Sequence, residues 1–377
     1  MKIIAVTTWF PSAKAPTMGT FVEKDVRVLA RDHDVEVVHL IAPHLADPHD
    51  ADPGDTGVRT LDHDGLRVHR IVMSPQRPDQ ILRARRLLEP LLAGADLVHT
   101  MAFPTLLPFA RSRPAAPWVH TEHWSGLTTP ATLPAAWRLA LPVLRPLLRR
   151  PDVVTAVCEY LARPIRAERR SRSTVIVPCI VPAPPTLAER SPREGRPFEL
   201  VGVGGLIDRK DPLLAVRTLA ELTARGHDVR LTWAGSGPLH DAVLALADEQ
   251  AVGDRLTLLG AVGAAGVSAA LDAADLFFLP TKADNFCVSA AEALMHGRPV
   301  VVGATGGQGE YIDASVGELV AHQDAAAYAD AIERVRRATA GLSAEEVAAT
   351  LGDRFSPETV RGGYLNAYDL ARTERGA

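Results

Sequence analysis

The sequence predicts an α/β protein built from two doubly wound, Rossmann-like domains. Three observations lead to this fold class. The chain has 377 residues, enough for two or three domains. Short β-branched runs alternate with longer segments of helical period, as in βαβ units. A stretch with six prolines and no periodicity, residues 178–197, separates two such series.

The expected strands follow in chain order. The first series comprises residues 2–6, 35–40, 66–72, 97–99, 118–121, 153–157 and 175–177. The second comprises residues 199–203, 229–234, 256–259, 276–279 and 299–302. We therefore expect a first domain over 1–185, a linker over 186–198 and a second domain over 199–355, with a C-terminal helix over 356–377 that returns to the first domain. Parallel sheets bind ligands at the carboxyl ends of their strands, so the expected site is a cleft between the domains.

Composition excludes several classes of protein. With 47% apolar and 23% charged residues, the chain is globular and not disordered. We find neither an apolar run long enough to span a membrane nor the apolar core of a signal peptide, so a cytoplasmic protein is expected. Three cysteines without a CxxC pair indicate neither a zinc ribbon nor a disulfide scaffold. Residues 1–190 carry 24 basic and 19 acidic side chains, but the net charge of −4 argues against nucleic acid as a partner.

Two loops after expected strands can approach phosphates. Gly235 and Gly237 form a G-S-G-P turn after residues 229–234, which suits phosphate binding or simply tight packing of a strand on a helix. After residues 199–203, Gly204 is followed by the cations Arg209 and Lys210. That pair suits a diphosphate, and its alternative is a solvated helix start.

A third loop carries two carboxylates eight residues apart. Asp284 precedes an expected helix, and Glu292 lies two turns into it. Glu292 stands inside an apolar run, where an acid is costly to bury without a partner. A polyhydroxyl ligand would supply that partner.

From about residue 200 to 313, the sequence resembles the retaining family-four glycosyltransferases of the GT-B fold. Their frame E-G-F-G-x-x-x-x-E-A-x-x-x-G-x-P-V-V reads D-N-F-C-V-S-A-A-E-A-L-M-H-G-R-P-V-V here. The segments G-S-G-P, L-L-G-A-V, A-D-L-F-F-L-P-T and G-G-Q-G-E match in order. In the first half, residues 11–21, 117–123 and 154–161 resemble the acceptor domain of that family.

The resemblance implies a role for each matching residue. It gives Lys210 the donor diphosphate, Glu292 the ribose hydroxyls and Asp284 a place beside the transferred sugar. It implies that His123 contacts the sugar or the acceptor, with His120 as the competing histidine. The donor contacts that it implies are Gly19, Gly204, Arg209, Lys210, Gly235, Phe286, Cys287, Val288, Glu292, Gly306 and Gly307.

Two positions depart from the family pattern. Gly205 stands where the family usually has an arginine, so one diphosphate cation is missing or is supplied by Arg209. Asp284 replaces a glutamate and is shorter by one methylene, which can alter the sugar specificity.

The resemblance therefore implies metal-independent transfer of a sugar from a nucleotide diphosphate sugar, with retention, and no other cofactor. No D-x-D motif ends a strand, and the His120/His123 pair has no third ligand nearby for zinc. The expected acceptor is a small molecule such as a secondary metabolite, a cell-envelope glycan or a lipid-linked group. Two rivals stay open: a nucleotide-sugar epimerase of the same fold, and a degenerate protein that only binds sugar nucleotides.

Arginines of the first domain suggest a further partner. In residues 137–150, helical spacing places an apolar stripe beside an arginine stripe, which suits an anionic membrane or an acidic acceptor. The alternative is a solvated face over a leucine core, and the cluster at 163–172 has the same two interpretations. The two stripes are Trp137, Leu141, Leu144 and Leu148, and Arg138, Arg145 and Arg149.

Overall fold

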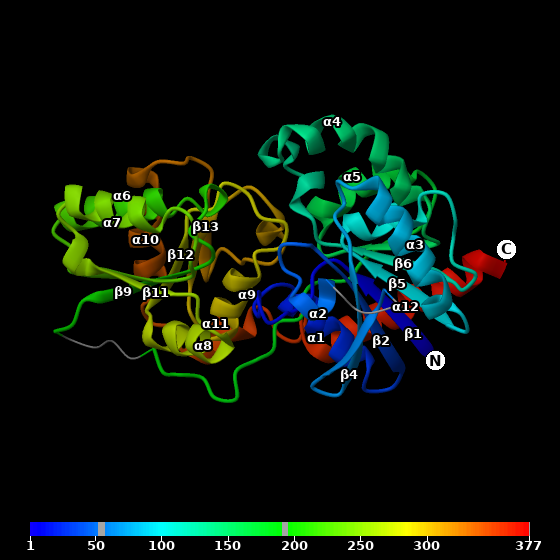
Figure 1. The fold of residues 1–377 in the computed structure, drawn as a ribbon. Helices are drawn as coiled ribbons and strands as arrows, with labels where there is room; N and C mark the ends of the chain where they lie inside the picture. The colour runs from blue at the N-terminus through cyan, green and yellow to red at the C-terminus, as the bar shows by residue number, and fades with distance from the viewer. Residues whose placement is uncertain (52–56, 191–194, 377) are drawn as a thin grey trace. The chain divides into compact units, whose positions relative to one another are not determined.

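The protein folds into two compact α/β units, shown in Figure 1. The computed structural model describes residues 1–51, 57–190 and 195–376. The first unit comprises residues 1–180 together with the C-terminal segment from Pro357, and the second comprises Val181–Ser356. The sequence prediction placed the boundary at residue 185. Among the described residues, no helix is long and apolar enough to cross a membrane.

The first unit is built on an eight-stranded sheet in the order β3-β4-β2-β1-β5-β6-β7-β8. Every strand pair is parallel except β3 with β4. The central strands are almost wholly buried, as expected for a sheet covered by helices on both faces. The strands are β1 (Lys2–Thr7), β2 (Asp34–Ile41), β3 (Arg59–His63), β4 (Leu66–Val72), β5 (Leu97–Met101), β6 (Trp118–Glu122), β7 (Val153–Ala156) and β8 (Thr174–Ile176).

The helices of this unit include one from the C-terminus. Helix α12, red in Figure 1, contacts α1, β6 and β7, and its residues Tyr364 and Tyr368 belong to the core around β1. Helix α4 ends at Leu144 and continues as the 3-10 helix η5, because Pro146 cannot donate the next α-helical hydrogen bond. The helices are α1 (Thr20–Leu29), α2 (Pro48–Ala51), α3 (Pro78–Leu92), α4 (Ala135–Leu144), α5 (Glu159–Arg169) and α12 (Pro357–Gly376), with the 3-10 helices η2 (Phe103–Phe109), η3 (Ser125–Leu127), η4 (Pro130–Thr132) and η5 (Arg145–Arg149).

The second unit is built on a six-stranded parallel sheet in the order β11-β10-β9-β12-β13-β14. Its strands are β9 (Phe198–Val203), β10 (Val229–Ala234), β11 (Leu256–Gly260), β12 (Leu276–Leu279), β13 (Val300–Gly303) and β14 (Gly317–Val320). Its helices are α6 (Pro212–Ala224), α7 (His240–Glu249), α8 (Ala264–Ala273), α9 (Val288–Met295), α10 (Ala325–Ala338) and α11 (Ala344–Ala349), with the 3-10 helices η6 (Asp208–Lys210), η7 (Gly253–Arg255) and η8 (Gly307–Glu310).

The prediction of two doubly wound sheets is confirmed, and all twelve expected strands are present. The sequence did not predict two of the strands, β3 and β14. Both lie at sheet edges, where one side of the strand is unpaired. Such strands lack the continuous apolar run that marks a buried parallel strand.

The strand order locates the point in each sheet where ligands bind. In the first unit the chain order reverses at β1, which lies between β2 and β5. In the second it reverses at β9, which lies between β10 and β12. Loops leaving neighbouring strands in opposite directions open a crevice at the carboxyl ends of the strands there. Each unit therefore has one preferred place for a ligand.

Candidate functional site

The loops that follow β9 and β12 meet at the switch point of the second sheet. Lys210, in η6 after β9, forms an ion pair with Asp284, in the loop after β12. The Arg209 guanidinium lies 3.3 Å from the same carboxylate oxygen of Asp284 and donates a hydrogen bond to the Ala283 carbonyl at 3.0 Å. The structure thus brings together three residues that the sequence analysis selected from separate loops.

The two cations keep Asp284 ionised. Burial raises the pKa of this carboxyl, but the charges of Lys210 and Arg209 and the backbone N–H of Cys287 outweigh it, so the pKa lies below its usual value. Nearby, Lys282 pairs with Asp208 at 2.7 Å and lies 3.6 Å from Asp211. The cations and carboxylates of these loops balance in number, but two cations meet a single carboxylate at Asp284, so the positive charge is concentrated there and favours an anionic ligand at that point.

Residues that the sequence analysis passed over hold the two loops together. The Lys282 N–H donates to the Arg209 carbonyl at 2.9 Å. The buried Thr281 hydroxyl donates to the same carbonyl at 3.1 Å. Their signal in the sequence was their place directly after the run 276–279, at the carboxyl end of a strand.

The glycines after β9 and β10 allow a close approach of backbones. A Cβ atom at Gly235 would lie 1.9 Å from the Gly204 carbonyl oxygen, so no side chain fits there. The Trp233 indole donates to that same carbonyl at 2.8 Å. At Gly205, by contrast, a Cβ atom would meet nothing closer than 3.5 Å. Packing therefore explains Gly235, whereas Gly205 has room for a side chain.

The loop after β13 lies directly against Asp284. The Asp284 N–H donates to the Thr305 carbonyl at 3.1 Å, and the Gly307 N–H donates to the carbonyls of Asp284 and Asn285 at 3.2 and 3.0 Å. A Cβ atom at Gly306 would lie 1.9 Å from the Asp284 carbonyl oxygen. The Gly307 amide thus bonds within the protein in this structure.

Helix α9 begins at Val288, so Asp284 precedes it as predicted. Cys287 caps the helix in a left-handed conformation, and its carbonyl accepts from the Tyr311 hydroxyl at 2.7 Å. Phe286 packs against Tyr311 and Phe355. Burial raises the pKa of the Cys287 thiol to about 11, so this cysteine is neutral at ordinary pH. Glu292 lies half-buried on α9.

In the first unit, His123 lies against α1. Its ring centre is 4.7 Å from that of Phe21, and its Nε2 is 3.9 Å from the Asp25 carboxylate. The Tyr364 hydroxyl of α12 donates to Asp25 at 2.8 Å. Burial, with the nearby His120, lowers the pKa of His123 to about 3, so its imidazole is neutral.

Asp25 and Tyr364 are absent from the sequence-based site, although Asp25 follows Val22 and precedes Val26 on the buried stripe of α1. Burial raises the pKa of Asp25 to about 7 against the hydrogen bond from Tyr364. The α1 helix itself starts at Gly19, where a Cβ atom would lie 2.4 Å from the Trp9 carbonyl oxygen. Gly19 is therefore required by the close approach of the β1 loop.

His120, the histidine that competed with His123 in the sequence analysis, is a core residue. Its side chain is fully buried in β6. Its Nδ1 bonds to the Thr100 hydroxyl at 2.9 Å and its Nε2 to the Glu122 carboxylate at 3.2 Å. With both ring nitrogens satisfied inside the unit, His120 has nothing left to offer an acceptor. Within the described ranges, no group of three His, Cys, Asp or Glu side chains is arranged to hold a metal ion.

Known proteins resemble this chain in both sequence and fold. The family model of the glycosyl transferase 4-like domain matches residues 17–179, and that of the glycosyl transferases group 1 matches residues 197–337. A D-inositol 3-phosphate glycosyltransferase of Mycobacterium leprae is 28% identical over 320 residues, which cover 77% of this chain and 72% of the relative. The Mycobacterium tuberculosis protein of the same name is 30% identical over 191 residues, 46% of this chain and 40% of its own.

Two solved structures share the fold at low identity. A sucrose-phosphate synthase from Thermosynechococcus elongatus superposes with a TM-score of 0.76 at 21% identity, covering 99% of this chain and 100% of that one. The Anabaena protein HepE, in complex with UDP and glucose, gives 0.73 at 18% identity, covering 98% and 99%. Fold and sequence together define a glycosyltransferase of the GT-B fold. The chain belongs to the group 1 glycosyltransferases, which confirms the predicted family, fold class and enzyme class.

Asp25→Asn should change how stability depends on pH. Since the carboxyl has a pKa of 3.8 when unfolded and about 7 when folded, folding takes up a proton between these values. Wild-type stability therefore falls as pH rises from about 4 to about 7, whereas the variant lacks this term. From pH 5 to pH 8, the Tm of Asp25→Asn should rise by several degrees relative to the Tm of wild type. Asp369→Asn, an exposed control on α12, the helix that carries Tyr364, should follow wild type. A profile of Asp25→Asn parallel to that of wild type would contradict the assignment.

Gly235→Ala and Gly205→Ala should differ sharply in stability. The added Cβ overlaps the Gly204 carbonyl in the first case and meets only ordinary contacts in the second. We expect the Tm to fall by about 5 °C or more for Gly235→Ala and to stay within about 2 °C for Gly205→Ala. Equal melting temperatures of the two variants would show that these loops do not approach each other as described.

Proposed function

We propose that the enzyme transfers a sugar from a nucleoside diphosphate sugar to a hydroxyl acceptor, with retention of the anomeric configuration. The observation that carries this proposal is the assembly of Arg209, Lys210 and Asp284 at the switch point of the second sheet. Its concentrated positive charge suits a diphosphate, and its carboxylate suits sugar hydroxyls. The similarity in fold to HepE, a protein bound to UDP and glucose, supports the same donor class.

The site residues then have distinct roles in the reaction. Lys210 and Arg209 stabilise the charge that grows on the diphosphate as the glycosidic bond breaks. Asp284 accepts hydrogen bonds from the transferred sugar while it orients both cations. Glu292 accepts from the ribose hydroxyls, and the backbone at Gly204, Gly235, Val288 and Gly306 lines the donor. In the first unit, the neutral His123 contacts the sugar, and the backbone at Gly19, before α1, contacts the leaving phosphate.

Retention follows from a same-face displacement. The bond between the anomeric carbon and the diphosphate oxygen breaks, and the acceptor oxygen bonds to the same face. The acceptor proton passes to the leaving diphosphate, so no protein nucleophile is needed. Asp284 fits this scheme because its low pKa makes it a weak base held in place by two cations.

The charge balance also supports a reaction without a metal ion. In metal-dependent transfer, a divalent cation neutralises the leaving diphosphate. Here Lys210 and Arg209 place two positive charges beside Asp284, and in this proposal they take the role of the divalent cation.

We place the reaction in the cytoplasm, in secondary-metabolite or cell-envelope glycan biosynthesis, with a small-molecule, glycan or lipid-linked acceptor. The relatives named for D-inositol 3-phosphate support a polyhydroxylated acceptor. Incubation with the donor alone separates transfer from the two rival functions. An epimerase releases a new nucleotide sugar, and a protein that only binds the donor releases nothing, whereas a transferase releases nucleoside diphosphate slowly by hydrolysis and rapidly once an acceptor is present.

Lys210→Ala should lose about 2–4 kcal/mol of transition-state stabilisation and Arg209→Ala about 1–3 kcal/mol, because each removes a cation from the diphosphate. We would measure kcat/KM with saturating acceptor in excess EDTA. Lys282→Ala is the matched control, since this lysine pairs with Asp208 in the same loops. A loss of kcat/KM of less than about threefold for Lys210→Ala would contradict its role at the diphosphate. Wild-type activity that needs added magnesium would contradict the metal-independent mechanism.

Asp284→Asn and Glu292→Gln should separate turnover from nucleotide binding. Asp284→Asn frees Lys210 and Arg209, so the affinity for the bare nucleoside diphosphate should hold or rise while kcat falls. Glu292→Gln should weaken that affinity by about 1–2 kcal/mol through the ribose contacts. Calorimetric titration of the nucleoside diphosphate measures both. If the two variants weaken binding equally, the division of roles is incorrect.

A further inference from the structure

Helix α4 of the first unit presents an apolar stripe to solvent. Leu139 is 81% exposed and Val143 is 78% exposed, whereas the other exposed large apolar side chains of the described chain range from 40% to 49%. The two residues lie one turn apart on the same helix face, together with the exposed Ala135 and Pro142. An apolar stripe this accessible on a folded domain marks a surface that something covers.

This stripe is not the one that the sequence predicted. The stripe of Trp137, Leu141, Leu144 and Leu148 had two interpretations, a contact surface or a leucine core, and the burial of Leu141 and Leu148 in the first unit favours the core. Trp137 packs edge-on against Trp124, which stacks on Phe103 of η2. The predicted stripe therefore anchors α4 to the rest of its unit, and the opposite face is left outward.

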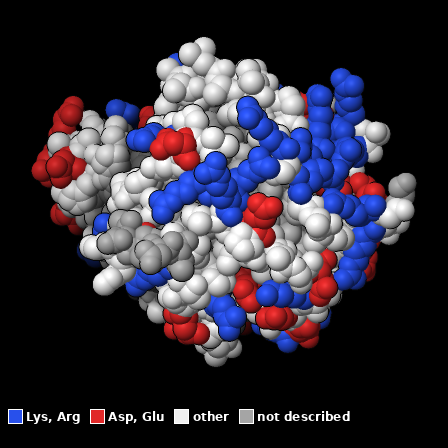
Figure 2. Space-filling model, turned by 45° about the vertical axis from the view of Figure 1, so that its right-hand side comes forward, with Lys and Arg blue, Asp and Glu red and all other residues white. Residues whose placement is uncertain are grey.

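Arginines surround α4, and acids compensate some of them: Arg145 and Arg149 pair with Glu168, and Arg113 pairs with Asp152. From residue 97 to residue 151 the sequence holds six arginines and a single acid, Glu122, which is buried. Arg138, on α4 itself, is exposed and has no ion pair within the described chain. Figure 2 shows lysine and arginine side chains gathered on one face of the molecule, with aspartate and glutamate side chains among them. We call Ala135, Arg138, Leu139, Pro142 and Val143 the α4 face.

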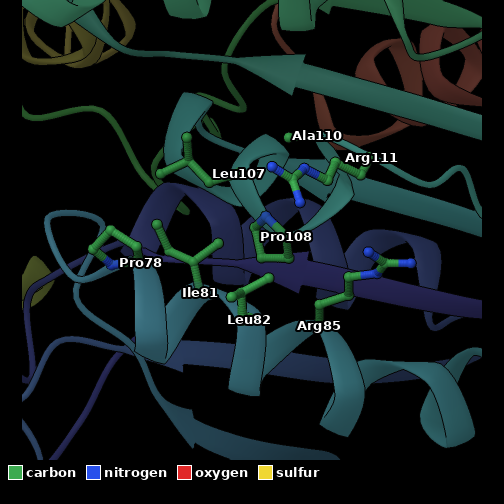
Figure 3. Close-up of a pocket in the computed structure, with 8 residues that line it drawn as sticks. All are labelled: Pro78, Ile81, Leu82, Arg85, Leu107, Pro108, Ala110 and Arg111. Atoms are coloured by element: carbon green, nitrogen blue, oxygen red, sulfur yellow. The ribbon is translucent and has the colours of Figure 1, made fainter.

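The cationic surface extends from α4 to α3. Helix η5 continues α4 and contacts η2, and η2 in turn contacts α3. Between α3 and η2 lies a pocket of about 260 Å³, shown in Figure 3. Its walls are apolar except for Arg85 and Arg111, neither of which pairs with an acid in the described ranges. Unpaired guanidinium groups beside apolar walls suit ligands that are both anionic and apolar.

We propose that the α4 face docks the enzyme on an anionic lipid bilayer. The apolar stripe enters the interfacial layer, while Arg138 and the neighbouring arginines reach lipid phosphates. A second copy of the chain is a poor occupant, because the unpaired Arg138 side chains of two such faces would repel each other. The docking involves no membrane-spanning segment and does not depend on the transfer chemistry, so it goes beyond the proposed function.

Vesicle binding by the full chain tests this proposal. Vesicles of phosphatidylcholine with about 30% phosphatidylglycerol should bind the protein about tenfold more strongly than pure phosphatidylcholine, and about 0.5 M salt should remove most of that difference. Leu139→Glu and Val143→Glu should each weaken partitioning about tenfold, and Arg138→Glu about threefold. Leu244→Glu, at an exposed leucine on α7 of the second unit, is the matched control and should bind like wild type.

The melting temperature and nucleoside diphosphate affinity of each variant show whether it remains folded. Equal binding to both kinds of vesicle, or none to either, would overturn the proposal. So would unchanged partitioning of Leu139→Glu, since the stripe would then take no part. A concentration-dependent dimer that Leu139→Glu abolishes would assign the face to a second copy instead and would equally overturn bilayer docking.

Discussion

The ion pairs between Asp284 and the two cations Lys210 and Arg209 fix the geometry of the second unit's site. They join loops from β9 and β12, the strands between which the sheet reverses direction. At a switch point the helices that follow neighbouring strands run to opposite faces of the sheet, so contacts between the loops are needed to hold them together. Other contacts also hold the loops of this site together. They are the close backbone approaches at Gly235 and Gly306 and the hydrogen bonds from Thr281 and Lys282. The ligand crevice is thus shaped by charge as much as by packing.

Buried carboxylates behave in opposite ways in the two units. Asp284 has two cations within reach, so its charge is stabilised despite burial. Asp25 has one hydroxyl, from Tyr364, and its second oxygen has no hydrogen-bond partner in the described structure. The same burial therefore leaves it near half-protonated at neutral pH. One acid supplies fixed charge for ligand binding, while the other ties α1 to α12 beside His123 with a bond that responds to protons.

The sequence predicted those features that depend on local pattern. Runs of β-branched residues predict buried parallel strands. The site residues Lys210, Asp284 and Glu292 could be predicted because they follow the ends of such strands in the sequence. Long-range partners were not visible: nothing near Asp25 signals Tyr364, more than three hundred residues away, and the partners of His120 lie partly on β5. The edge strands β3 and β14 lack an apolar run. In α4 the helical phase was correct, but which of its two apolar faces is covered depends on Trp124 and η2.

The return of α12 to the first unit has a consequence for biosynthesis. Tyr364 and Tyr368 fill the core beside β1, so the unit that is translated first lacks part of its interior until residues 357–376 emerge from the ribosome. The second unit, residues 181–356, is contiguous in sequence, so its core needs no later segment of the chain. The core of the first unit therefore cannot be completed before the whole second unit has been synthesised.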